Sequence, residues 1–222
     1  MVKAVLFDFD GTLVDTAPGI VKTMQGTFLE MGLAVPDESA VRQTIGLPLF
    51  DSLKHLGNFS DEDARRGVEI YRRLFATLEL GNMSVFPGVA ETLKELSSRG
   101  VRMAICTSRG QNSLHMILSS FGLEEYFEDF VTASDGLRSK PAPDPVFALL
   151  ERMKLRSDET LVVGDTTFDI QMGAAAGCRT VAVTYGNHSR EKLESVRPDF
   201  LTDAFRNIPD YVSETVAEGD EQ

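Results

Sequence analysis

Short apolar runs alternate with amphipathic segments along most of this chain. The apolar runs are each followed by a polar or glycine-containing turn, and they predict buried strands at 2–9, 101–108, 129–134, 160–166 and 179–186. A weaker sixth run, DFLT, lies at 199–202. Apolar residues at helical spacing predict helices between the strands, at 89–100, 111–122, 144–155 and 168–177. This order predicts an α/β fold with a doubly wound parallel sheet.

Residues 16–85 interrupt the alternation, because they contain no convincing strand. Glycine and proline divide this interval into segments that read as helices, at 17–32, 37–46, 49–57 and 60–80. We therefore predict two domains. Residues 1–15 and 86–222 form the α/β core, and residues 16–85 form an all-helical insert.

The amino-acid composition limits the kinds of molecule that this protein is expected to bind. The chain has 222 residues, of which 22 are basic and 34 acidic, giving a net charge of −12. Such a surface repels nucleic acid and anionic membranes, so we expect neither as a partner. An anionic substrate would need positive charge concentrated at its site. Either a monomer or a homodimer fits this composition.

Other features indicate a cytoplasmic protein. No apolar run is long enough to span a bilayer, and Asp8 cuts the N-terminal apolar run too short for a signal peptide. Cys106 and Cys178 fit no metal-binding spacing and are interpreted as reduced core thiols. The acidic end at 213–222 lacks periodicity and is expected to fray.

The first predicted strand ends in DFDGTLVD, residues 8–15, which contains Asp8 and Asp10. Burying two carboxylates this close together costs folding free energy unless a positive charge lies beside them. In open parallel sheets, ligands bind at the carboxyl ends of the strands. The other strand ends and their loops deliver further polar side chains there, namely Thr107, Ser108, Arg109, Arg138, Lys140, Asp165 and Asp169.

This set of residues suits phosphoryl transfer. Mg²⁺ prefers oxygen ligands, and Asp8 and Asp165 can supply two carboxylates. A hydroxyl and a lysine can neutralise the equatorial oxygens of a transferring phosphoryl group. Side chains two apart on a strand point to opposite faces, so the chain must turn after Asp8 for Asp10 to face the same site. Gly11 makes that turn easier.

Four parts of the sequence resemble, in order, the signature motifs of the haloacid dehalogenase-like (HAD) phosphatase superfamily. They are DFDGTLVD, Thr107, Lys140 and GDTTFD at 164–169. The resemblance covers nearly the whole chain. DTAPGI at 15–20 and IGLPL at 45–49 are most similar to the phosphoglycolate phosphatase group. Ser108 stands where asparagine would be more usual in that group.

The resemblance implies roles for these residues. Asp8 would attack phosphorus to form an aspartyl phosphate, and Asp10 would act as the acid and base. The implied catalytic residues are Asp8, Asp10, Thr107 and Lys140. Mg²⁺ would be held by Asp8, Asp165 and the backbone carbonyl of Asp10, with Asp169 holding its outer shell. The implied substrate contacts are Ser108, Arg109 and Gly46. The insert would be a mobile cap that excludes water.

The expected activity is hydrolysis of a small phosphorylated metabolite, with phosphoglycolate as the leading substrate. Asp10 argues against the dehalogenases and phosphonate-cleaving members, which lack it. The absence of histidine from 15–24 argues against a phosphomutase. Pyrophosphate, nucleoside monophosphates and sugar phosphates remain alternative substrates. A phosphoacceptor signalling domain would be shorter, whereas a non-catalytic binding protein on this fold stays open.

Several charged residues receive no functional role. The arginines of the 60–80 segment are expected on its solvent-facing side, at Arg65, Arg66, Arg72 and Arg73. The histidines sit in no catalytic spacing, at His55, His115 and His188.

Overall fold

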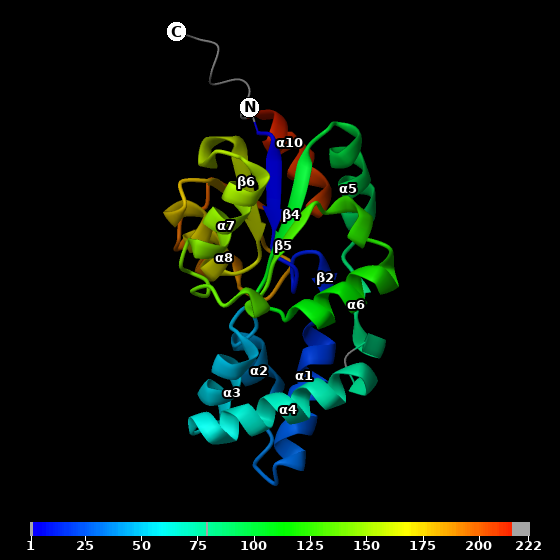
Figure 1. Cartoon of the computed structure of the whole chain (residues 1–222), viewed down its shortest axis with the longest axis vertical. Helices are drawn as coiled ribbons and strands as arrows, with labels where there is room; N and C mark the ends of the chain where they lie inside the picture. The colour runs from blue at the N-terminus through cyan, green and yellow to red at the C-terminus, as the bar shows by residue number, and fades with distance from the viewer. Residues whose placement is uncertain (1, 79, 215–222) are drawn as a thin grey trace.

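The computed structural model describes residues 2–78 and 80–214 and has a six-stranded parallel sheet at its centre (Figure 1). The strand order is β5-β4-β1-β6-β7-β8. The strands are β1 (Ala4–Phe7), β4 (Arg102–Cys106), β5 (Asp129–Val131), β6 (Thr160–Gly164), β7 (Arg179–Val183) and β8 (Phe200–Thr202). All six predicted strands occur, the weak sixth included, each within its expected range.

Helices cover both faces of this sheet, which confirms the doubly wound fold class. One layer holds α5 (Val89–Ser98), α6 (Gln111–Phe121) and α10 (Ile208–Glu214), and the other holds α7 (Asp144–Met153) and α8 (Thr167–Ala175). The short helix α9 (Arg190–Glu194) packs beside α8.

The central strand β1 shows why the sheet is covered on both faces. Val5 and Phe7 join the core cluster beneath α5 and α6, whereas Ala4 and Leu6 join the cluster beneath α7. All four side chains are fully buried. Side chains of this apolar run therefore pack into two hydrophobic clusters, one on each face of the sheet, as expected for a strand in the middle of a parallel sheet.

The inserted segment forms four helices that lie beyond the carboxyl ends of the strands (Figure 1). They are α1 (Ala17–Glu30), α2 (Glu38–Gln43), α3 (Leu49–Gly57) and α4 (Asp61–Leu78). These helices pack around a cluster of their own, made of Val21, Met24, Phe28, Val41, Leu53 and Tyr71. The domain boundaries at 16 and 85 stay a prediction, but the all-helical character of the main part of the insert is observed.

One expectation for the insert is wrong, because the insert does contain a strand. β2 (Val14–Asp15) pairs antiparallel with β3 (Ser84–Val85), so that Val14 faces Val85 at the point where the insert begins and ends. Two-residue strands are too short to show an alternating pattern, which is why the sequence does not reveal them.

Short elements make up the rest of the regular structure in the described residues. Among them are 3₁₀ turns at Leu80–Asn82, Glu124–Tyr126, Ala133–Asp135, Ser157–Glu159 and Phe205–Asn207. Helices α9 and α10 are not predicted from the sequence. The acidic end was expected to fray, yet Ser213 and Glu214 belong to α10; residues 215–222 lie outside the described residues.

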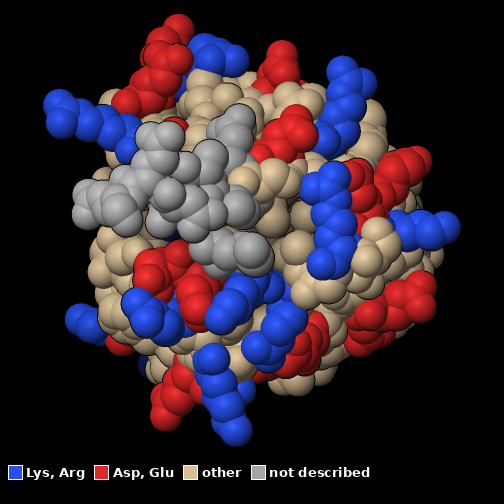
Figure 2. Space-filling view, turned by 90° about the horizontal axis from the view of Figure 1, so that it is seen from above, with Lys and Arg blue, Asp and Glu red and all other residues tan. Residues whose placement is uncertain are grey.

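The surface carries both signs of charge. Figure 2 shows the end of the molecule opposite the insert, where acidic and basic side chains lie next to one another. Within the described residues, no helix has the length and apolar character needed to cross a membrane. Cys106 and Cys178 are buried and free, as predicted, and burial raises the pKa of Cys106 to about 12.

Candidate active site

The chain leaves β1 through a tight turn that brings two carboxylates to one cavity. Asp8 follows the last residue of β1, and its amide still bonds to the Val163 carbonyl of β6 at 2.8 Å. Gly11 then takes a φ of +86°, and its amide donates to the Val14 carbonyl at 2.9 Å. The turn places Asp8 and Asp10 on the same cavity wall, as the sequence predicts.

Lys140 joins the end of β1 to the first turn of α8 by a pair of short hydrogen bonds. Its ammonium lies 2.7 Å from Asp8 Oδ1 and 2.6 Å from Asp169 Oδ1. All three residues are buried. Asp169 also accepts bonds from the Thr166 amide and hydroxyl at the start of α8, so it both caps that helix and holds the lysine.

Asp165 follows β6 and is held by groups from two other loops. Its Oδ1 accepts a hydrogen bond from the Thr12 hydroxyl at 3.1 Å. Its Oδ2 accepts bonds from the backbone amide and side-chain amide of Asn187, at 2.7 and 2.8 Å. Asn187 is absent from the predicted site, although it lies in the loop after β7, the strand next to β6. A search for amides after each strand end could have found it.

These carboxylates form a site that fits a divalent cation. One oxygen each from Asp8, Asp165 and Asp169 lie within 4.8 Å of one another, and all three residues are buried. Lys140 is the cation that pairs with two of them. With every group ionised, three negative charges face one positive charge. Two unbalanced buried charges are costly, and hard oxygen donors in this arrangement suit a divalent metal.

The pKa values of these buried groups reflect the same excess of negative over positive charge. Burial, together with the neighbouring Asp169, raises the pKa of Asp165 to about 7, although the hydrogen bonds from Asn187 and Thr12 act in the opposite direction. Burial also raises the pKa of Asp8 well above its usual value, although Lys140 acts in the opposite direction. Burial lowers the pKa of Lys140, but the carboxylates of Asp169 and Asp8 outweigh it and raise that pKa overall. The lysine is therefore charged, whereas two carboxyls lack a counter-charge.

The end of β4 supplies Thr107, Ser108 and Arg109 to the cavity, as predicted. The Thr107 hydroxyl accepts a hydrogen bond from the Arg109 amide at 3.1 Å. The Arg109 side chain bonds to both carboxylate oxygens of Asp10, and the Thr16 hydroxyl donates to Asp10 Oδ1 at 2.6 Å. Asp10 is thus fixed by one residue from the core and one from the start of the insert.

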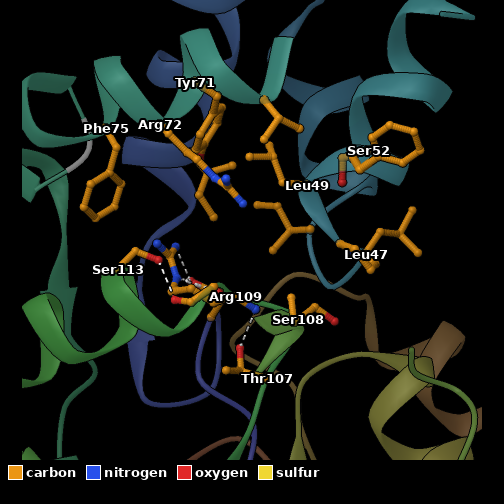
Figure 3. A pocket seen from close by; sticks show the side chains of 18 of the residues that line it. Leu47, Leu49, Ser52, Tyr71, Arg72, Phe75, Thr107, Ser108, Arg109 and Ser113 are labelled. Atoms are coloured by element: carbon orange, nitrogen blue, oxygen red, sulfur yellow. Dashed lines mark hydrogen bonds and ion pairs between the residues drawn. The ribbon is translucent and has the colours of Figure 1, made fainter. Parts of the chain in front are cut away.

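A cavity of about 700 Å³ lies between the insert and the carboxyl ends of the strands. Figure 3 shows side chains from α4 on one side, and Thr107, Ser108 and Arg109 on the other. Gly46 lines it too, with a φ of +102°, and a Cβ there would lie 3.2 Å from Thr166 Cγ2. The loop of the insert at Gly46 therefore meets the start of α8 directly.

Arg138 and Arg72 lie in different places relative to the site. Arg138, a candidate for the site, pairs with Asp144 at 2.8 Å, and its side chain is 77% exposed. Arg72 is exposed, as expected for the solvent-facing side of its helix, and it also lines the cavity. One turn of a helix exposes residues in several directions, so composition alone could not separate Arg72 from Arg73, which pairs with Glu30.

His188 was assigned no role, but it supports the site. The Thr167 amide in the first turn of α8 donates to His188 Nδ1 at 3.0 Å. This bond requires the ring proton on Nε2. Burial lowers the pKa of His188 to about 4, and the nearby Lys192 adds to that effect. A neutral His188 thus holds the helix start from which Asp169 extends.

Comparisons with known proteins agree with this geometry. The family model for haloacid dehalogenase-like hydrolases matches residues 5–183. A protein of Dickeya dadantii (strain 3937) named "Probable phosphatase IndB" is 36% identical over 214 residues, covering 94% of this chain and 92% of that protein. A phosphoglycolate phosphatase of Rhodospirillum rubrum is 33% identical over 221 residues, covering 96% and 91%.

A solved structure shares the whole fold. The crystal structure described as a predicted phosphatase from Clostridium acetobutylicum superposes with a TM-score of 0.88 at 27% identity, covering 96% of this chain and 99% of the other. The matched family model spans both the inserted helices and the strands that carry the carboxylates. On these grounds, the chain belongs to the haloacid dehalogenase-like hydrolase family.

Proposed function

We propose that this protein is a Mg²⁺-dependent phosphatase that hydrolyses a small phosphomonoester through an aspartyl-phosphate intermediate. The observation that carries the proposal is the buried group of Asp8, Asp165 and Asp169 around Lys140, with Asp8 also facing the cavity. Phosphatase activity itself is consistent with the family and with the names of the two relatives.

In the proposed first step, a carboxylate oxygen of Asp8 attacks phosphorus. A bond forms between that oxygen and phosphorus while the bond from phosphorus to the substrate's alcohol oxygen breaks. Asp10 gives its proton to the leaving oxygen. In the second step, Asp10 takes a proton from water, and the water oxygen attacks phosphorus and releases Asp8. Both residues line the cavity, as these roles require.

Other residues bind the phosphoryl group and balance its negative charge during the transfer. Lys140 holds Asp8 in place and balances negative charge on the phosphoryl oxygens, which Thr107 can also contact from the end of β4. Bound Mg²⁺ would supply further positive charge for those oxygens, held by Asp8, Asp165 and the Asp10 carbonyl, with Asp169 outside them. The Asp10 carbonyl lies 3.4 Å from the side-chain amide of Asn187, which also holds Asp165.

The inserted helices act in this proposal as a cap at 16–85 over the core formed by 1–15 and 86–222. The cavity is lined by residues of both parts, which supports this division. The short β2–β3 pair connects them and is the natural place for a hinge. Closing such a cap over the substrate would exclude water from the first step.

Phosphoglycolate is the substrate that we favour, because a relative at 33% identity over 96% of this chain is named for that activity. Pyrophosphate, a nucleoside monophosphate and a sugar phosphate are the alternatives. Phosphate release from each should be measured with Mg²⁺ and again with a chelator. We expect chelator-sensitive turnover that is greatest with phosphoglycolate. Turnover that survives the chelator contradicts the metal requirement, and no turnover of any ester contradicts the activity.

Variants test the residue roles separately. Asp8→Asn should abolish turnover, and Asp10→Asn should reduce it about 10²–10⁴-fold, the usual contribution of a general acid and base. Asp51→Asn, an exposed aspartate on α3, is the matched control and should keep normal turnover. Normal turnover in Asp8→Asn would refute the nucleophile assignment, and normal turnover in Asp10→Asn would refute the acid and base assignment.

A further inference from the structure

Arg72 occupies a distinct place in the cavity. It belongs to α4, and Figure 3 shows its side chain extending from that helix into the cavity, above the loop that carries Arg109. The next residue, Arg73, pairs instead with Glu30 of α1 on the outside of the insert. Of these two adjacent arginines, Arg72 therefore faces the cavity, whereas Arg73 lies on the outside of the insert.

Among the described residues that line the cavity, Arg72 is the charged side chain that the insert provides. Its surroundings are mostly apolar, with Ile20, Met24, Ile45, Leu49, Val68 and Phe75 on the insert side. These side chains offer an anionic ligand neither charge nor hydrogen bonds, so Arg72 supplies the positive charge on this side of the cavity. A ligand with negative charge at its far end would therefore gain most from meeting this arginine.

The two arginines of the cavity differ in what they already bind. The Arg109 guanidinium bonds to both oxygens of Asp10, and its side chain is 7% exposed. Arg72 is exposed, and within residues 2–78 and 80–214 no ion pair or hydrogen bond of its side chain occurs. Arg72 is therefore the guanidinium that can take up a new anionic partner without breaking an existing pair.

We propose that Arg72 is a specificity residue that binds the non-reacting anionic group of the substrate, either a carboxylate or a second phosphate. This inference rests on the phosphatase function proposed above. The reacting phosphate lies at Asp8, and the far end of the substrate extends toward α4. A guanidinium forms paired hydrogen bonds with either kind of anion, which explains an arginine at this position better than a lysine.

The test compares two phosphate monoesters and pyrophosphate, which differ at the end away from the reacting phosphate. Phosphoglycolate carries a carboxylate, 2-hydroxyethyl phosphate replaces that carboxylate with a neutral alcohol, and pyrophosphate carries a second phosphate. The values of kcat and KM should be measured for all three with Arg72→Gln, Arg72→Lys and wild type. Arg73→Gln is the matched control, because it removes an arginine from the same helix outside the cavity.

We expect Arg72→Gln to lower kcat/KM for the anionic substrates by about tenfold, the usual effect of losing a hydrogen bond to a charged group. The loss should appear mainly in KM, and 2-hydroxyethyl phosphate should be unaffected. Arg72→Lys should restore part of the preference. A loss confined to phosphoglycolate identifies a carboxylate as the partner, and a loss confined to pyrophosphate identifies a phosphate.

Other results separate this inference from the proposed function. If Arg72→Gln turns over all three compounds like wild type, or loses activity on the neutral ester equally, Arg72 does not select the anionic end, although the phosphatase function stands. An equal loss in Arg73→Gln would also overturn the inference, because it would show an effect on the helix. If wild type hydrolyses none of the three, this inference fails, whereas the proposed function fails only if the nucleoside monophosphate and the sugar phosphate are not hydrolysed either.

Discussion

Arg109 holds both carboxylate oxygens of Asp10, with its Nε 3.0 Å from Oδ1 and 3.0 Å from Oδ2. The same guanidinium lies 5.9 Å from the ring centres of Phe9 and Phe75. Phe9 belongs to the core and Phe75 to α4 of the insert. One side chain thus orients the proposed acid and base while it packs against both parts of the protein.

Replacing Arg109 should therefore reduce the chemistry that depends on Asp10. We expect Arg109→Met to lower kcat by about 10–100-fold for an alkyl phosphate, as is usual for the outer partner of a catalytic group. The loss should be smaller for p-nitrophenyl phosphate, whose leaving group needs little protonation. The measurement is kcat for the two esters, with Asp10→Asn as the reference. Equal losses on both esters would show that Arg109 acts in another way, such as substrate binding.

The raised pKa of Asp165 predicts a pH-dependent response to metal. Without metal, folded Asp165 has a pKa of about 7, compared with about 3.9 for an unfolded chain. The folded state thus holds an extra proton between these values, and this stabilising effect is lost as the pH rises through 7. Mg²⁺ competes with that proton. We expect Mg²⁺ to raise the melting temperature more at pH 8 than at pH 6.

The measurement is a thermal melt with Mg²⁺ and with chelator at both pH values. His188 titrates at lower pH, but its effect is present with and without metal and cancels in the comparison. Asp165→Asn is the control and should show little response to Mg²⁺ at either pH. An equal response of wild type at pH 6 and pH 8 would contradict the assignment of Asp165 as a ligand.

Gly186 lies against the metal-site carboxylate. A Cβ at this position would overlap Asp165 Cβ and Oδ2 and approach the Gly11 carbonyl oxygen. Gly186→Ala should therefore displace Asp165, with a cost of about 1–3 kcal/mol in folding free energy and loss of the melting shift with Mg²⁺. Gly81→Ala is the control, because no described residue other than its chain neighbours lies within 4 Å of its Cβ position. A normal Mg²⁺ shift in Gly186→Ala would refute this account.

Much of the fold and of the carboxylate group could be predicted from the sequence. Buried parallel strands leave long apolar runs, and the carboxyl ends of those runs meet at one edge, so Asp8 and Asp165 could be brought together before the structure was known. Lys140 could be placed at the same edge because its loop follows the third predicted strand, whereas its role as a catalytic residue rested on the family resemblance.

The remaining features depend on side-chain direction or on very short elements. The pairing of Arg109 with Asp10 joins residues 99 positions apart, and no periodicity reports it. Arg72 and Arg73 are adjacent in a polar helix, so their different directions follow from packing. Asn187 and His188 act through a loop whose course is set only when β7 lies beside β6.

The pairing of Val14 with Val85 places the beginning and the end of the insert side by side. The chain between them can lengthen or shorten without changing the register of β1 with its two neighbours in the sheet. Each doubling of a flexible loop costs only about 0.6 kcal/mol in closure entropy. Under the proposed division into cap and core, this junction would let the helical insert be exchanged as a module, together with the side chains that it contributes to the cavity, while the carboxylates stay in place.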